Sequence, residues 1–148
     1  MSKKPPKKDI PYWKKKAWDA FSRYIRTRDA IKTTGGIDYC VCISCGQTKP
    51  AFGIGCIQAG HFVPSRRNSV LFDEECVNGQ CYGCNCGQGG MWVEYEEIMV
   101  RRHGRKKVEE MKRRKHETVK YTAGDLEEIR DKYKQKEKDL IEKFKKGE

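Results

Sequence analysis

The sequence lacks any long apolar run. Hydrophobic and charged residues each make up 36% of its 148 residues, and the mean hydropathy is −0.90. No stretch reaches the roughly 20 apolar residues that a helix needs to cross a bilayer. The basic N-terminus also lacks the apolar segment of a signal peptide. These absences predict a protein that stays in the cytoplasm and does not enter a membrane.

Apolar residues are too few for a large core, so an additional cross-link is expected. The chain has eight cysteines. Cytoplasmic thiols are kept reduced, so this cysteine content indicates metal ligation rather than disulfides. Cys42 with Cys45 and Cys81 with Cys84 form two Cys-x-x-Cys pairs that 35 residues separate. Together the pairs supply four thiolates, which suit one tetrahedral structural zinc ion.

The roles of the other cysteines stay open. They are Cys40, Cys56, Cys76 and Cys86. Cys40 and Cys86 each lie two residues from a proposed zinc ligand and could replace it. Otherwise all four are expected to be reduced, partly buried thiols that act as small apolar groups. The alternative to a zinc site is a redox protein, but that would predict a single Cys-x-x-Cys pair in a βαβ setting.

Acidic residues are scarce beside basic ones, and the net charge is +11. Residues 1–30 carry ten Lys or Arg against three Asp or Glu, and residues 91–148 carry eighteen against fourteen. The centre, residues 31–90, carries four of each and all eight cysteines. A neutral centre between basic arms is typical of a nucleic-acid-binding protein, although solubility alone can explain it. DNA is therefore the expected partner, with no membrane and no small-molecule substrate.

Capping residues and apolar periodicity divide the chain into elements. Residues 1–10 read as a disordered basic tail, and residues 11–148 as one domain. A helix is predicted over 11–30, capped by Asp9 and with Pro11 in its first turn. The cysteine-rich centre has the short alternating runs and glycine turns of β-structure, and residues 68–75 read as another short strand or a turn.

Basic helices are predicted over 104–146, preceded by a helix from residue 91 that Gly104 ends. Thr122 and Asp125 form a capping box at the start of the last helix. This helix is amphipathic, so it is expected to pack on the first helix or to pair with a second chain.

Several short motifs between Tyr12 and Phe144 resemble the NinG (Rap) recombination protein family of lambdoid phages. The matching residues are YW at 12–13, CISCG at 42–46, AGHF at 59–62, FDE at 72–74, QC at 80–81, CN at 84–85, Gly90, Tyr95, Gly104 and the lysine-rich last helix. The resemblance implies an α+β fold: a small zinc-stabilised ββα-metal (His-Me finger, HNH) core over 38–100, flanked by N- and C-terminal helices. It also implies similarity to phage endonuclease VII and a role in cutting branched DNA in the host cytoplasm.

His61 and Asn85 are the candidate catalytic residues. A lone histidine is usually structural, but His61 precedes a loop and a helix in the order of a ββα-metal site. A neutral imidazole can accept a proton from water near physiological pH, so His61 is the expected general base. Asn85 directly follows the second cysteine pair, and its side-chain carbonyl is a hard ligand suited to a catalytic Mg²⁺ or Mn²⁺.

Two positions depart from the family pattern. Gly60 stands where a metal-binding Asp or His often precedes the base, and Cys76 replaces the usual asparagine five residues before the second cysteine pair. The second ligand to the catalytic cation is therefore expected among Asp73, Glu74 and Asn78, with Asn78 preferred.

Basic side chains near these motifs are expected to contact the DNA backbone. They are Lys14, Lys15, Lys16, Arg66, Arg67, Arg101 and Arg102. Arg66 and Arg67 lie in the loop after His61, where they would bind the phosphate beside the cut, unless they are simply exposed loop residues.

The sequence thus predicts a zinc-stabilised DNA endonuclease that needs Mg²⁺ or Mn²⁺. Its selectivity for D-loops or Holliday junctions follows from the resemblance alone. A symmetric junction favours a homodimer, for which the last helix could supply the interface. The alternative is a non-catalytic zinc-finger protein that binds DNA as an accessory to recombination, which the departures at Gly60 and Cys76 favour.

Overall fold

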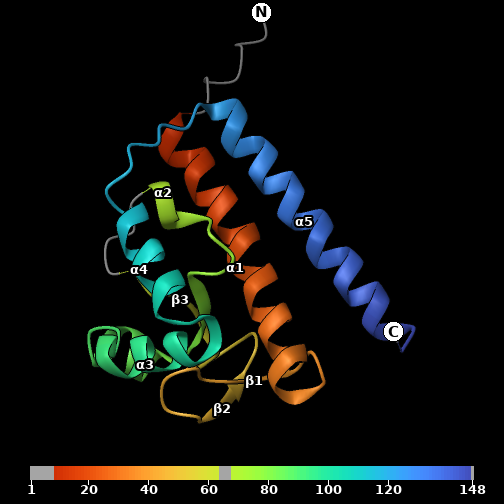
Figure 1. The fold of residues 1–148 in the computed structure, drawn as a ribbon. Helices are drawn as coiled ribbons and strands as arrows, with labels where there is room; N and C mark the ends of the chain where they lie inside the picture. Colours follow the sequence, from red (N-terminus) through yellow and green to blue (C-terminus); the bar gives the residue numbers. More distant parts are fainter. Residues whose placement is uncertain (1–8, 64–67, 148) are drawn as a thin grey trace, which may run out of the picture.

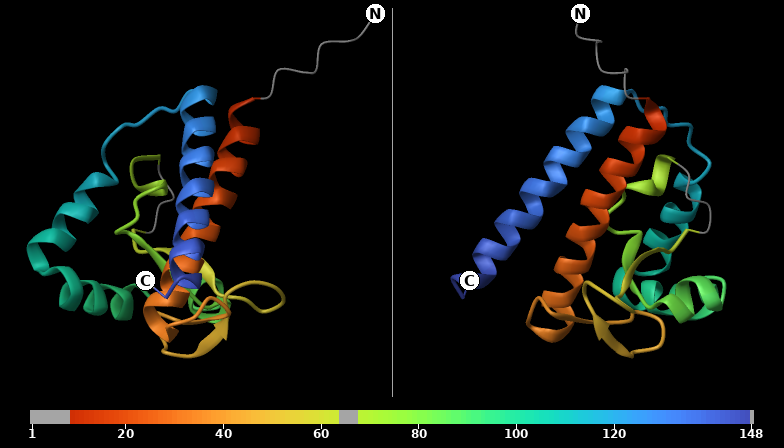
Figure 2. Two further views of the ribbon diagram at one scale, coloured as in Figure 1. Left: turned by 90° about the vertical axis from the view of Figure 1, so that its right-hand side faces the viewer. Right: turned by 180° about the vertical axis from the view of Figure 1, so that it is seen from behind.

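A long N-terminal helix organises the molecule. The computed structural model describes residues 9–63 and 68–147. Within them, α1 (Ile10–Thr34) runs between α5 (Ala123–Lys145) on one side and the strands and shorter helices on the other (Figures 1 and 2). Asp9 accepts a hydrogen bond from the Tyr12 amide, and Gly35, at a φ of 75°, ends the helix. The predicted helix over 11–30 is confirmed but continues to Thr34, and residues 1–8 of the predicted tail lie outside the described residues.

Two antiparallel strand pairs lie beside α1. They are β1 (Tyr39–Val41) with β2 (Thr48–Pro50), and β3 (Gln58–His61) with β4 (Val77–Gln80). In the second pair His61 lies opposite Val77, and Gly60 lies opposite Asn78. Because successive side chains of a strand project to opposite faces, His61 and Asn78 lie on different faces of this pair.

Short helices connect and cover these strands. They are α2 (Asn68–Leu71), the π-helical turn η1 (Gly83–Gly87), α3 (Trp92–His103) and α4 (Arg105–Arg114). Gly104 separates α3 from α4, as predicted. Of the two alternatives for residues 68–75, the strand is wrong, because α2 occupies the first half and turns follow it. The fold is therefore mixed α+β with two small antiparallel sheets. None of the described helices is long and apolar enough to span a bilayer.

The last helix packs on the first, which was one of the two arrangements that the sequence predicted. The Thr122–Asp125 capping box is present at its start. The Tyr133 ring contacts Phe21 and Tyr24 of α1, at centroid distances of 4.8 and 5.4 Å. Aromatic pairs at this distance stabilise a helix interface beyond their buried area. This face of α5 is thus covered by its own chain.

Asp73 and Glu74 tie the C-terminal helices to the core. Asp73 forms an ion pair with Arg114 of α4. Glu74 Oε2 accepts hydrogen bonds from the Tyr133 hydroxyl at 3.0 Å and from Lys136 Nζ at 2.7 Å, both on α5. Burial alone would raise the pKa of Glu74, but the bonds from Lys136 and Tyr133 outweigh it and lower the pKa.

The lowered pKa of Glu74 predicts a pH-dependent contribution to stability. In acid the unfolded chain takes up this proton first, so stability is lost as the pH falls from the ordinary value of 4.5 through the folded value. Glu74→Gln is expected to reduce the free energy of unfolding at pH 7 by about 1 kcal/mol at most, because the ion pair is partly exposed. Urea titrations should show this difference shrinking below pH 4.5.

Glu128→Gln provides the control for this prediction. Glu128 is exposed on α5 and has no ion pair among the described residues. Acid also protonates other groups of the chain, but equally in both variants, so the difference between them isolates Glu74. An unchanged difference between pH 7 and pH 3 would contradict the prediction.

Candidate metal centre and adjoining cavity

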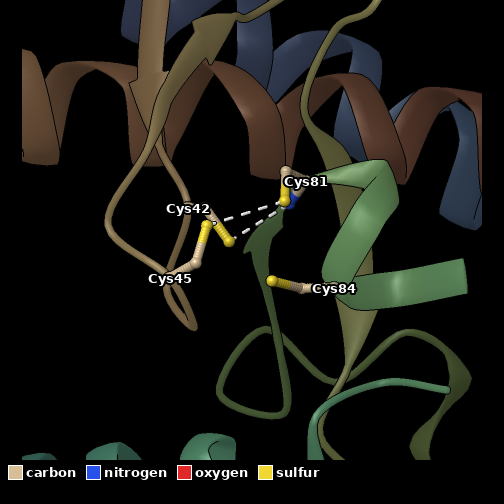
Figure 3. Close-up of side chains that lie close together, drawn as sticks. All are labelled: Cys42, Cys45, Cys81 and Cys84. Atoms are coloured by element: carbon tan, nitrogen blue, oxygen red, sulfur yellow. Dashed lines mark hydrogen bonds between the residues drawn. The ribbon is translucent and has the colours of Figure 1, made fainter. Parts of the chain in front are cut away.

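Four cysteines from two distant segments form one cluster. Cys42 and Cys45 lie in the turn after β1, Cys81 follows β4, and Cys84 lies in η1. Their four Sγ atoms lie within 4.8 Å of one another, and Figure 3 shows them converging on a common point. Cys45 Sγ and Cys81 Sγ are 3.7 Å apart. A Zn–S bond of about 2.3 Å in a tetrahedron places two sulfurs about 3.8 Å apart, so the geometry suits zinc.

Backbone turns hold the sulfurs in these positions. Gly46 adopts a φ of 75° and its amide donates to the Cys42 carbonyl, which closes the first turn tightly. The amides of Ser44 and Cys81 donate to Cys42 Sγ at 3.4 and 3.3 Å. Burial opposes ionisation of Cys42, but these donors outweigh it and lower its pKa. The cluster could therefore hold a structural metal such as zinc.

The remaining cysteines lie outside the cluster. Cys40 and Cys76 are fully buried, and burial raises their pKa values to about 11 and about 12. They act as small apolar groups, as predicted. Cys56 is half-buried, as predicted, whereas Cys86 differs from the prediction because it is exposed. Both line the cavity described next. None of the four replaces a member of the cluster.

His61 and Asn85 line a single cavity of about 430 Å³. Its other lining residues are Trp18, Ser22, Arg26, Cys56, Ile57, Gln58, Ala59, Cys86 and Trp92. His61 ends β3, and Asn85 lies in the helical turn that also carries Cys84. The structure thus brings together the two residues that the sequence singled out, and the turn that carries Asn85 also carries Cys84 of the cysteine cluster.

The imidazole of His61 is held on two sides. It is 7% exposed, and its ring stacks on Trp18 of α1 with centroids 5.0 Å apart. Nε2 lies 3.2 Å from the Leu71 carbonyl oxygen. A carbonyl oxygen only accepts, so Nε2 carries the hydrogen and Nδ1 is the basic atom of the neutral ring.

Gln58 orients Asn85. The Asn85 amide nitrogen donates to Gln58 Oε1 at 2.8 Å, and the Cys86 thiol donates to the same oxygen at 3.5 Å. With its nitrogen occupied, Asn85 presents its carbonyl oxygen Oδ1 as an acceptor. No sequence pattern pointed to Gln58, because it lies 27 residues from Asn85 along the chain.

Arg26 of α1 also lines the cavity and supplies a positive charge there. Its guanidinium lies over the Phe52 ring at 4.5 Å and donates weakly to the Ala51 carbonyl and the Cys56 thiol, at 3.5 and 3.6 Å. No carboxylate pairs with it in the described part of the chain. Burial lowers its pKa from 12.5, so placing this charge here costs free energy.

Comparison with known proteins identifies the family. The family model described as Bacteriophage Lambda NinG protein matches residues 1–143. The chain belongs to the NinG family. It is 32% identical over 130 residues to Protein ninG of Escherichia phage 933W and to Protein ninG of Salmonella phage P22, which covers 87% of this chain. The chain spans only 58% of the length of these relatives, and no solved structure matches it.

The structure places Asn78 apart from the His61 cavity. Its amide nitrogen donates to the Tyr95 hydroxyl at 3.1 Å, and its oxygen accepts from Arg28 at 3.4 Å. It is buried on the other face of the β3–β4 pair. Asp73 and Glu74, which belong to the motifs that resemble the NinG family, bind α4 and α5 instead. None of these three predicted ligands lines the cavity.

Among the described residues, the predicted DNA-binding side chains do not form one patch in this NinG chain. Lys14 and Lys15 border a hollow beside Trp18, toward the cavity, whereas Lys16 faces α5. Arg102 lies near Lys32 of α1. Burial lowers the pKa of Lys32, and the positive charge of Arg102 lowers it further. Along α1, Lys32 is about 27 Å from Lys14 at 1.5 Å per residue.

Arg101 and Arg102 also belong to the predicted set. Both are exposed in the last turn of α3. Arg66 and Arg67 lie outside the described residues.

The cysteine cluster predicts zinc-dependent stability. Cys84→Ser is expected to abolish stoichiometric zinc binding and to lower the melting temperature, because zinc-site binding energy is folding energy. Cys86→Ser is the matched control, since it removes an exposed thiol outside the cluster. Zinc content by mass spectrometry and thermal melts would measure both. Equal zinc loss in the two variants would contradict this assignment of ligands.

Proposed function

We propose that this chain is a metal-dependent DNA endonuclease of the ββα-metal type that cuts branched DNA such as D-loops or Holliday junctions. One observation carries the proposal: His61 and Asn85 line the same cavity, one at the end of a strand and one in the turn fixed by the cysteine cluster. The net charge of +11 suits a phosphodiester substrate. Selectivity for branched DNA follows from the family resemblance.

His61 is the proposed general base. With the hydrogen of its ring on Nε2, which faces the Leu71 carbonyl, Nδ1 accepts a proton from the attacking water. The Leu71 contact and the Trp18 stack hold the ring, so little reorientation is needed before proton transfer. Arg26 lines the same cavity and would offset the charge of the bound phosphate.

The catalytic cation would bind Asn85 Oδ1. Mg²⁺ or Mn²⁺ would supply charge neutralisation at the leaving oxygen. The described lining of the cavity contains no carboxylate, so the remaining ligands would come from the DNA phosphate and water. Cation binding is therefore expected to be weak without DNA and to strengthen with it.

His61→Ala tests the enzymatic proposal. Purified protein is expected to cut a labelled four-way junction or D-loop with Mg²⁺ or Mn²⁺, and not with EDTA. The variant should lose at least about 100-fold in rate, the usual contribution of a general base. His103→Ala, an exposed histidine at the end of α3, is the control at matched zinc content. Tight binding without cutting under any metal would favour the accessory alternative.

Gln58 variants test the positioning of Asn85. Gln58→Leu removes the acceptor for the Asn85 amide and is expected to reduce kcat about tenfold, as loss of a supporting hydrogen bond does at metal sites. DNA affinity should stay unchanged. Gln58→Glu keeps an acceptor oxygen and should recover most of the rate. If Gln58→Leu keeps the wild-type kcat, Gln58 does not position Asn85. If Gln58→Leu and Gln58→Glu lose the same fraction of kcat, Gln58 has only a structural role.

A further inference from the structure

Trp92 stands between two hollows on the surface. It begins α3 and lines the cavity of His61 and Asn85. It also lines a second hollow of about 250 Å³, whose other residues are Phe62, Val63, Glu96, Lys112 and Lys115. Its side chain is 38% exposed. An aromatic face is therefore available to a ligand at the mouth of the proposed active site.

The backbone before Trp92 is shaped to hold the indole. Gly90 adopts a φ of 103°, and a Cβ on Gly90 would lie 2.6 Å from the indole carbon Cζ2. Gln80 donates to the Gly90 carbonyl at 2.8 Å and fixes this glycine. Met91 adopts a φ of 52°, which costs free energy for a residue other than glycine. The ring is thus fixed against the glycine at an energetic cost to the backbone.

Positive charges lie on both sides of this ring. Arg26 lies in the first hollow without a carboxylate partner among the described residues. Lys115 lies half-buried in the second hollow and likewise has no ion pair within 9–63 and 68–147. Lys112 beside it pairs with Glu96. An aromatic ring between cations is the arrangement by which proteins bind unpaired nucleic-acid strands, stacking bases and pairing phosphates.

We infer that Trp92 stacks on an unpaired nucleobase of the bound DNA, with the flanking phosphates at Arg26 and Lys115. The inference rests on the proposed function, because it places the scissile strand in the His61 cavity. The substrate feature that Trp92 selects is an unpaired nucleotide next to the cut. Such nucleotides occur where DNA branches or is gapped, and a continuous duplex lacks them.

Binding measurements without added Mg²⁺ or Mn²⁺, in a buffer without chelator so that a structural zinc ion is retained, test this inference without requiring cleavage. Fluorescence anisotropy would give Kd values for a labelled duplex and for the same duplex with a short single-stranded gap. The wild type is expected to prefer the gapped DNA. Trp92→Ala should weaken gapped-DNA binding about tenfold, within the range for loss of one base–aromatic stack, and leave duplex binding unchanged. Trp92→Phe should retain the preference.

Two exposed neighbours outside the cavity supply the controls. Val93→Ala and Tyr82→Ala change side chains that are 68% and 64% exposed. Neither should alter the preference, and all variants should match the wild type in zinc content and circular dichroism. Loss of the preference in Tyr82→Ala as well would overturn a specific role for Trp92.

The outcomes separate this inference from the endonuclease proposal. If the wild type has no preference for gapped DNA, or if Trp92→Ala weakens both DNAs equally, the inference is wrong whatever the protein cuts. If the preference depends on Trp92 but no cleavage occurs, the base-stacking site stands and the endonuclease proposal fails. If cleavage depends on His61 but Trp92→Ala keeps the preference for gapped DNA, the endonuclease proposal stands and the base-stacking inference is wrong.

Discussion

Close packing of four thiols is the constraint on which the rest of the structure depends. Sulfurs within 4.8 Å of one another cannot ionise together without a compensating cation. A structural zinc ion would supply it, and its binding free energy of about 10–16 kcal/mol is comparable with the whole stability of a small domain. The cluster joins the β1–β2 turn to η1, and Asn85 follows Cys84 directly. Metal binding would therefore also position Asn85, the proposed ligand of the catalytic cation.

Neighbouring arginines on α1 serve different purposes. Arg28 pairs with Asp29 and donates to the Glu74 and Val77 carbonyls, so it binds α1 to the strand pair. The Asp29 carboxylate in turn accepts the Gly79 amide at 2.7 Å. Arg26, two residues earlier, has no carboxylate partner among the described residues and lines the cavity. Partial burial of this charge lowers its pKa and costs free energy, which an anion bound in the cavity would offset.

Sequence patterns correctly predicted those features that depend on residues close together along the chain. The helix caps at Asp9 and Thr122, the break at Gly104 and the two cysteine pairs each depend on residues within a few positions of one another. No local pattern placed Gln58, Arg26 and Trp92 at one site, because they come together only where β3, α1 and α3 meet at one cavity. Asn78 was misplaced for a related reason: side chains alternate along a strand, so a residue near His61 in the sheet still projects to its other face.

The departures at Gly60 and Cys76 bear less on catalysis than the sequence suggested. A Cβ at position 60 would lie 2.2 Å from Gln80 Oε1, so packing against Gln80 requires glycine there. That side of the strand is the one facing Asn78 and away from His61. Cys76 is buried in the apolar cluster with Phe62 and Tyr95. Neither residue lines the His61 cavity, so neither substitution removes a donor from it. The two departures therefore leave the described lining of the cavity unchanged.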